Sequence, residues 1–250
     1  MILDEVSQSA VNEVWKYCGK ASESFPRNLE RAVALGLPVT LVKLPRLHIS
    51  SVGEWLVARG PKLKTPLGRV DRPIRGCIIA WRGHGVIFVD GADPEDEQRF
   101  TLAHEIAHFL FDYFVPRRRA LAELGPQIGD VLDAVRAPTA DERLIALLRH
   151  VPLRPYVNMM ERDQDVGAFN SDLEAVETSA DRGAFVLLAP PAEVWRRVGA
   201  LAQRFEDRVQ QIAVPLQQTF GLPPFAAQRY SRLLLVKARK GRTWAESHLR

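Results

Sequence analysis

The chain has 250 residues, of which 46% are hydrophobic and 26% are charged, and its formal net charge at pH 7 is +4. This composition is typical of a globular protein, and the length allows one large domain or a core with added helices. The small positive excess argues against a protein built chiefly to bind nucleic acid, because only two short basic runs, 117–119 and 237–242, stand out.

Cysteine content and the N-terminal sequence indicate the compartment. The two cysteines, Cys18 and Cys77, do not make a disulfide framework, and we expect both to be buried as small hydrophobes. The N-terminus lacks the basic and apolar segments of a signal peptide, and no apolar run approaches the length of a membrane span. We therefore expect a cytoplasmic protein that is not inserted into a membrane.

The N-terminal third predicts three helices, one strand and a long loop. Apolar residues at helical spacing indicate helices over 4–20, 28–35 and 50–59. The β-branched run 39–42 indicates a strand, and the Pro-rich stretch 60–75 indicates a loop.

A β-hairpin and a well-marked helix follow. Two apolar, β-rich runs, 77–81 and 86–90, flank a short connection that contains two glycines. Asp93 then precedes a proline as a candidate N-cap, so a helix is expected over 94–113, ending before Pro116. The remainder predicts helices: two within 117–150, a capped one over 171–189, and others over 193–213 and 224–236.

The helix over 94–113 carries the clearest chemical motif, His104-Glu105-Ile106-Ala107-His108. Residues four apart project from the same face of a helix, so His104 and His108 can bind one metal ion. Glu105 lies beside that face, where it can reach a water on the metal and act as general base.

A third ligand is available on the helix over 171–189. Glu177 and Asp181 are again four apart, so one carboxylate can bind the metal while the other accepts the free N–H of a liganding histidine. We assign Glu177 as the ligand and Asp181 as the partner of a histidine. Two imidazoles and one carboxylate favour Zn²⁺, with iron, cobalt and manganese as alternatives. A donor to the developing oxyanion is also needed, and the candidates by residue type are His84, Tyr113, His150 and Tyr156.

These motifs resemble those of a known family. Residues 99–108 look like the active-site helix of the ImmA/IrrE metallo-endopeptidases, and residues 177–190 resemble that family's second motif. The resemblance implies His104, His108 and Glu177 as zinc ligands, with Glu105 as the catalytic base.

The resemblance also implies a fold and a substrate. The fold is expected to be α+β and zincin-like, with a small mixed or antiparallel sheet, an active-site helix and additional helices. The expected regions are an N-terminal one over 1–60, a catalytic core over 61–192 and a C-terminal helical one over 193–250. The substrate implied is a protein, often a helix-turn-helix repressor of a stress or mobile-element response. In zincins the strand before the active-site helix, here 86–89, forms the rim of the cleft, and we expect an extended substrate to pair with it.

Two features depart from the family pattern. The 69 positions from His108 to Glu177 (177 − 108 = 69) exceed what compact members need, so a helical insertion is expected at about 115–165. Gly183 stands where the family usually has Phe. Residues 205–235 are similar to the degenerate helix-turn-helix common near the C-terminus of family members, and we expect them to pack instead of reading DNA.

Two other functions compete with proteolysis. The first is a metal-stabilised antitoxin or regulator that binds its partner without cutting it. The second is a DNA-binding regulator that uses the C-terminal helices, which would need a concentrated basic face. Glu105 favours the peptidase, because a protein that only binds has no need of a general base beside the metal.

Overall fold

The computed structural model describes residues 2–18, 24–59, 70–133, 135–148, 156–161 and 171–248. Within them the strands are β1 (Val39–Leu44), β2 (Ile74–Trp81), β3 (His84–Asp90) and β4 (Tyr156–Glu161). The helices are α1 (Glu5–Cys18), α2 (Leu29–Gly36), α3 (Ile49–Arg59), α4 (Glu95–His108), a π-helix (Phe109–Phe114), α5 (Val115–Leu124), a 3₁₀ turn (Pro126–Ile128), α6 (Gly129–Leu132), α7 (Ala140–Leu148), α8 (Ser171–Leu188), α9 (Pro191–Arg197), α10 (Phe205–Gln218) and α11 (Pro224–His248).

The four strands form one mixed sheet in the order β1-β3-β2-β4. The predicted hairpin is confirmed as β2 and β3, which pair antiparallel at the centre, while β1 joins β3 in parallel. Strand β4 pairs antiparallel with β2. The prediction that residues 86–89 offer a free edge to a substrate is therefore wrong, since both sides of β3 are paired. The two edge strands of the sheet are β1 and β4, and β4 is the one that lies next to β2.

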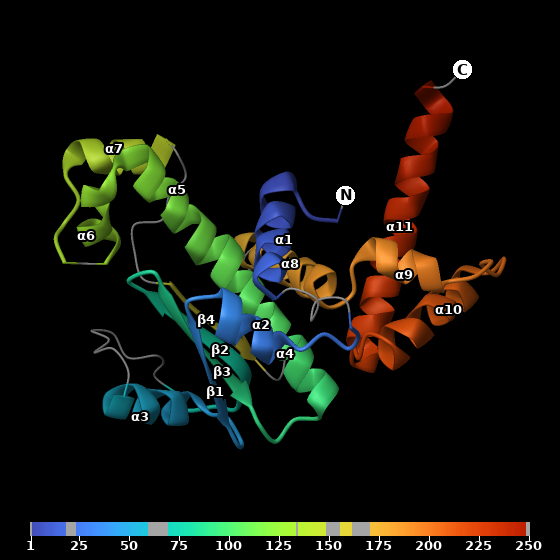
Figure 1. Ribbon diagram of the computed structural model, residues 1–250, viewed down its shortest axis with the longest axis horizontal. Helices are drawn as coiled ribbons and strands as arrows, with labels where there is room; N and C mark the ends of the chain where they lie inside the picture. Colours follow the sequence, from blue (N-terminus) through green and yellow to red (C-terminus); the bar gives the residue numbers. More distant parts are fainter. Residues whose placement is uncertain are drawn as a thin grey trace.

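Helices cover both faces of the sheet (Figure 1). Side chains alternate along a strand, so Ile78 and Ile87 join the larger core with α1, α2, α4 and α8. Their neighbours Cys77 and Phe88 join a smaller core under α3. Because both faces are covered, the central strands are apolar along almost their whole length. The α+β prediction is confirmed, and the buried face toward α4 fixes that helix against the sheet.

The active-site helix runs on past its predicted end. Helix α4 passes into the π-helix and then into α5, so Pro116 does not stop it. A π-helix already interrupts the α-helical hydrogen bonds, and Pro116 lies in the first turn of α5, where its missing N–H is tolerated. The predicted cap is also corrected: α4 begins at Glu95 with Pro94 as its N-cap, and no side chain caps it.

The C-terminal half differs from the prediction in three places. Strand β4 lies inside the stretch that was expected to be a helical insertion. The helix predicted over 193–213 is divided into α9 and α10, and α11 extends well beyond residue 236. Helices α10 and α11 pack against each other around a turn that contains Gly221, which has a positive φ of 66°.

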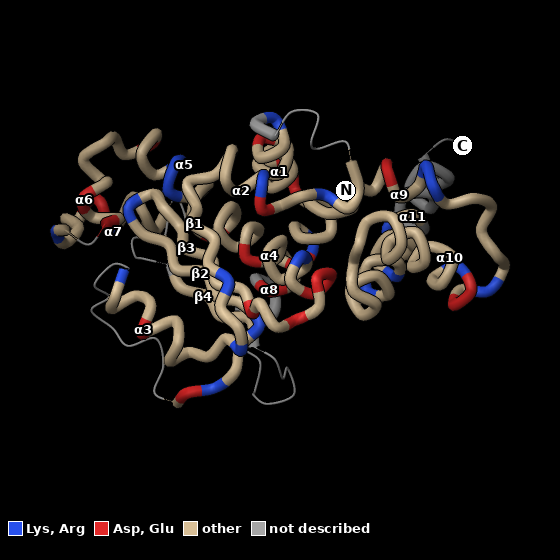
Figure 2. Tube along the Cα trace, turned by 60° about the horizontal axis from the view of Figure 1, so that its bottom comes forward, with Lys and Arg blue, Asp and Glu red and all other residues tan. Residues whose placement is uncertain are grey.

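Charge is distributed without a dominant sign over the described elements. Figure 2 shows basic and acidic residues interspersed, including those on α9 and α10. No helix in the described ranges combines the length and apolar character needed to cross a membrane.

Candidate metal centre

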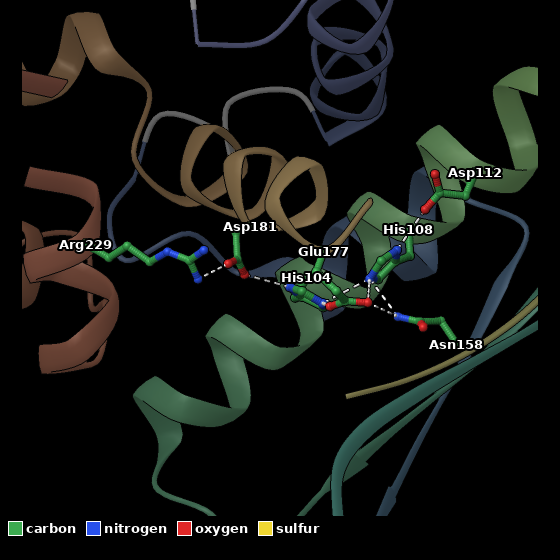
Figure 3. Close-up of polar contacts among 7 residues, drawn as sticks. All are labelled: His104, His108, Asp112, Asn158, Glu177, Asp181 and Arg229. Carbon is green, nitrogen blue, oxygen red and sulfur yellow. Dashed lines mark hydrogen bonds and ion pairs between the residues drawn. The ribbon is translucent and has the colours of Figure 1, made fainter. Parts of the chain in front are cut away.

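The candidate site lies between two packed helices, α4 and α8 (Figure 3). Helix α4 presents His104 and His108 one turn apart, and both side chains are buried. Helix α8 presents Glu177 opposite them. The two Nε2 atoms are 3.0 Å apart, and Glu177 approaches His104 Nε2 at 3.2 Å and His108 Nε2 at 3.5 Å.

This spacing fits a metal ion. The three ligand atoms all lie within 4.8 Å of one another. Ligands about 2.0 Å from a tetrahedral zinc ion are about 3.3 Å apart, close to the three separations observed here. Two imidazoles and one carboxylate leave the fourth position open, as in catalytic zinc sites and unlike closed structural ones.

Carboxylates hold the other ring nitrogen of each histidine. Asp181 Oδ1 lies 3.0 Å from His104 Nδ1, and Asp112 Oδ2 lies 2.8 Å from His108 Nδ1. An N–H on each Nδ1 donates to its carboxylate and leaves Nε2 free to bind a metal. Sequence reasoning named Asp181 but missed Asp112. The available signal was its position four residues after His108, the same spacing that was used for Glu177 and Asp181.

Asn158 is a second residue that sequence reasoning missed. It lies on β4 opposite Ile78, so it faces α4, and its Nδ2 is 2.7 Å from His108 Nε2 and 3.2 Å from Glu177 Oε1. The side chain therefore contacts the same atoms that would bind the metal. Nothing in the local sequence singles it out, because its approach depends on β4 pairing with β2.

The electrostatics of the ligands show how strongly the cluster attracts positive charge. Burial lowers the pKa of His104, but hydrogen bonds to Asp181 and Glu177 outweigh it and raise the pKa to about 10. The pKa of His108 is raised for similar reasons, with Asp112 as its first partner. Burial raises the pKa of Glu177, but hydrogen bonds with the two histidines reverse this and hold it well below the usual range. A metal ion would replace these protons, so binding should release them.

Glu105 occupies a different environment from the ligands. Its side chain is fully buried, and neither carboxylate oxygen has a hydrogen-bond partner among the described residues. Burial raises its pKa to about 7, although the nearby histidines oppose the rise. Gly76 on β2 makes room for it, since a Cβ there would lie 2.9 Å from Glu105 Oε1. A buried carboxylate whose oxygens can still accept hydrogen bonds is suited to act as a base toward a water molecule.

The oxyanion candidates proposed by residue type have other contacts. The Tyr113 hydroxyl accepts a 2.6 Å hydrogen bond from the backbone N–H of Gly83, in the hairpin turn. His84, the first residue of β3, has its Nε2 3.1 Å from Thr40 Oγ1 on β1. His150 and the side chain of Tyr156 lie outside the described residues. The structure brings neither Tyr113 nor His84 into contact with the ligands, whereas the amide of Asn158 does reach the ligand atoms of His108 and Glu177.

The geometry predicts about one zinc ion per chain. Metal analysis of protein purified without added metal should find it, and His104→Ala should abolish binding because it removes a ligand. Asp181→Ala and Asp112→Ala should each weaken zinc affinity about 10–100-fold, because each removes the partner that orients a ligand. Equal loss in both variants would show that Asp112 matches Asp181 in importance. No zinc in the wild type, with none regained on addition, would contradict the site.

One comparison with known proteins gave a match. Residues 67–127 match the family model described as the IrrE N-terminal-like domain, a metallopeptidase-type domain. The matched segment includes the hairpin, the two histidines and Glu105, whereas Glu177 and Asp181 lie beyond it. Searches of curated proteins and of solved structures found no match for the chain.

Proposed function

We propose that this chain, whose residues 67–127 match the IrrE N-terminal-like domain, is a cytoplasmic, zinc-dependent metallo-endopeptidase of the ImmA/IrrE family. One observation carries the proposal. The cluster of His104, His108 and Glu177 adjoins the buried carboxylate of Glu105, which has no partner of its own among the described residues. A site that only binds metal for stability gains nothing from such a carboxylate.

The chemistry follows from the residues around the cluster. When bound, a zinc ion supplies a water of lowered pKa and polarises the carbonyl of the scissile peptide. Glu105 accepts the proton of that water and passes it to the leaving amine. Asp181 and Asp112 keep the ligand nitrogens of the two histidines pointing inward. The burial of Glu105 keeps its pKa near neutrality, where a base can both accept and return a proton.

Asn158 is our candidate for the missing oxyanion donor. Its amide N–H₂ lies within hydrogen-bonding distance of the ligand atoms of His108 and Glu177, so this donor is directly beside the metal centre. An amide donor in a buried site can stabilise the negative charge that develops on a peptide oxygen.

Asn158→Ala should therefore lower kcat about 10²–10³-fold while leaving zinc content unchanged. The measurement is kcat and KM on a peptide or protein substrate, with metal analysis of the same sample. Met159→Ala, on the opposite face of β4, is the matched control for damage to the strand, since Met159 packs against the α3 core. Equal losses in both variants would assign the effect to the strand and remove Asn158 from the mechanism.

The proposed substrate is a transcriptional repressor of a stress or mobile-element response, as the family resemblance implies. We infer that it binds as an extended segment along β4. Among the described strands β4 pairs only with β2, which leaves its other edge for main-chain hydrogen bonds, and Asn158 places this strand beside the metal ligands. This replaces the expectation that β3 would be the rim.

A cleavage assay tests the function. A helix-turn-helix repressor chosen as candidate substrate is incubated with the zinc-loaded protein, and the products are identified by mass spectrometry. One defined cut that a chelator prevents and added zinc restores supports the endopeptidase. Stable complex formation without any cut would favour the alternative, a metal-stabilised binding protein of the same fold.

A further inference from the structure

An arginine from the C-terminal region reaches the carboxylate that orients His104. Arg229, on α11, pairs with Asp181 Oδ2, while Asp181 Oδ1 is the oxygen that contacts His104 (Figure 3). Asp181 is nearly buried, with 9% of its side chain exposed, whereas 55% of the Arg229 side chain is exposed, so the guanidinium reaches the buried carboxylate from the surface. Arg229, Asp181 and His104 thus form one continuous chain of contacts leading to a ligand atom.

Arg229 projects from a part of α11 that is firmly held. The next residue, Tyr230, is fully buried, stacks on Phe185 of α8 at 4.6 Å and donates its hydroxyl proton to the Ala189 carbonyl at 2.8 Å. At the start of α11, Phe225 packs edge-on against Phe100 of α4, with ring centroids 5.5 Å apart. The helix is therefore fixed against both helices that carry the metal ligands.

We propose that Arg229 is a positioning residue of the metal centre, so that the site is completed by a helix about a hundred residues beyond the matched family segment. A carboxylate that bridges a guanidinium and an imidazole has both oxygens engaged. It therefore has one preferred orientation, and it fixes the plane of the His104 ring. Without Arg229, Asp181 can rotate, and His104 loses part of its alignment toward Glu177 and His108. This inference rests on the proposed metal site but not on proteolysis.

The test is zinc affinity, measured by competition with a chromogenic chelator on the full-length protein. Arg229→Met keeps the length of the side chain but removes its charge and donors, and it should weaken zinc binding about 10-fold. Arg229→Lys should restore part of the affinity, because an ammonium can pair with Asp181 without the two-pronged geometry of a guanidinium. With cobalt in place of zinc, the intensity of the visible absorption bands reports ligand geometry. Wild type, Arg229→Lys and Arg229→Met should rank in the same order by this intensity as they do by zinc affinity.

Two controls separate positioning from folding. Arg232→Met changes an arginine on the same helix that pairs with exposed Glu206 at 2.8 Å, and it should leave zinc affinity unchanged. In the double variant Asp181→Asn/Arg229→Met, the loss should be no larger than in Asp181→Asn alone, because Arg229 acts only through Asp181. Additive losses, or an Arg229→Met protein that binds zinc as tightly as wild type, would overturn the inference alone. A wild type that binds no zinc would overturn the metal site and this inference together.

Discussion

Glu105→Gln should retain zinc and partner binding but lose cleavage. Glu105 is not one of the three residues that form the metal-binding cluster, and its carboxylate makes no hydrogen bond to them, so replacing it should not disturb the metal. Glutamine has nearly the same shape but cannot accept a proton, and a positioned general base contributes about 10²–10⁴-fold to a rate. The measurement compares zinc content, substrate affinity and single-turnover cleavage rate between the variant and the wild type.

Stability provides the check that Glu105→Gln has folded. Burial raises the pKa of Glu105 from 4.5 to about 7, so the folded state holds this proton more tightly than the unfolded state does. Ionising the side chain as pH rises from about 4.5 through 7 therefore destabilises the metal-free protein. Removing the charge should leave the Tm of the metal-free variant at pH 8 no lower than that of the wild type. Glu95→Gln, exposed at the start of the same helix, should change neither rate nor Tm appreciably.

Cellular behaviour distinguishes the two functions that share this site. If the protein cuts its regulator, Glu105→Gln should hold the intact regulator and leave the controlled genes unchanged. If instead the variant restores the regulatory phenotype as fully as the wild type, and neither yields a cleaved product, the protein acts by binding and the peptidase proposal fails.

The parts of the site that sequence reasoning predicted are those encoded locally. Side chains four residues apart share a helix face whatever the rest of the fold does, so the placement of His104 with His108, and of Glu177 with Asp181, follows from helix geometry alone. The hairpin was equally predictable, because two apolar runs around a glycine-containing turn specify pairing between neighbours. That α4 and α8 meet at these residues had to be assumed from ligand chemistry.

The parts that were missed depend on contacts distant in sequence. Strand β4 has a weak β pattern, and it is a strand because it pairs with β2, which lies about eighty residues earlier. Asn158 enters the site only through that pairing. Arg229 depends in the same way on how α11 packs against α8. Asp112 is only four residues from His108 and could have been found from that spacing. It was missed because the helix was expected to end nearby, and the π-helix that carries Asp112 has no simple sequence signal.

Gly183 shows how closely α4 and α8 must approach, and it leads to the largest structural prediction. A Cβ at this position would lie 2.6 Å from the Ala107 Cβ and 2.5 Å from a ring carbon of Phe111. The ring of Phe111, on the π-helix that continues α4, thus takes up space that the Phe expected at position 183 from the family resemblance would need. Gly183 therefore permits the close helix contact that brings Glu177 within reach of the two histidines.

Gly183→Ala should lower the free energy of unfolding by about 1–3 kcal/mol, because an overpacked helix contact must separate or distort. Since Glu177 lies on the same helix, the separation should also weaken zinc binding at least about 10-fold. Gly53→Ala is the matched control: Gly53 lies inside α3 with no atom within 4 Å of the added Cβ, so this change should stabilise the protein by about 0.5–1 kcal/mol.

The opposite sign of these two glycine substitutions is the decisive result. Helix propensity favours alanine at both positions, so the close contacts with Ala107 and Phe111 are what can make Gly183→Ala unfavourable. Ala107→Gly added to Gly183→Ala removes one of the two groups that the new Cβ meets, while the Phe111 ring remains. It should therefore recover part of the zinc affinity, even if a glycine in α4 costs about 1 kcal/mol of stability. If Gly183→Ala instead stabilises the protein and leaves zinc affinity intact, α4 and α8 are not held as closely as described, and the metal centre does not depend on this contact.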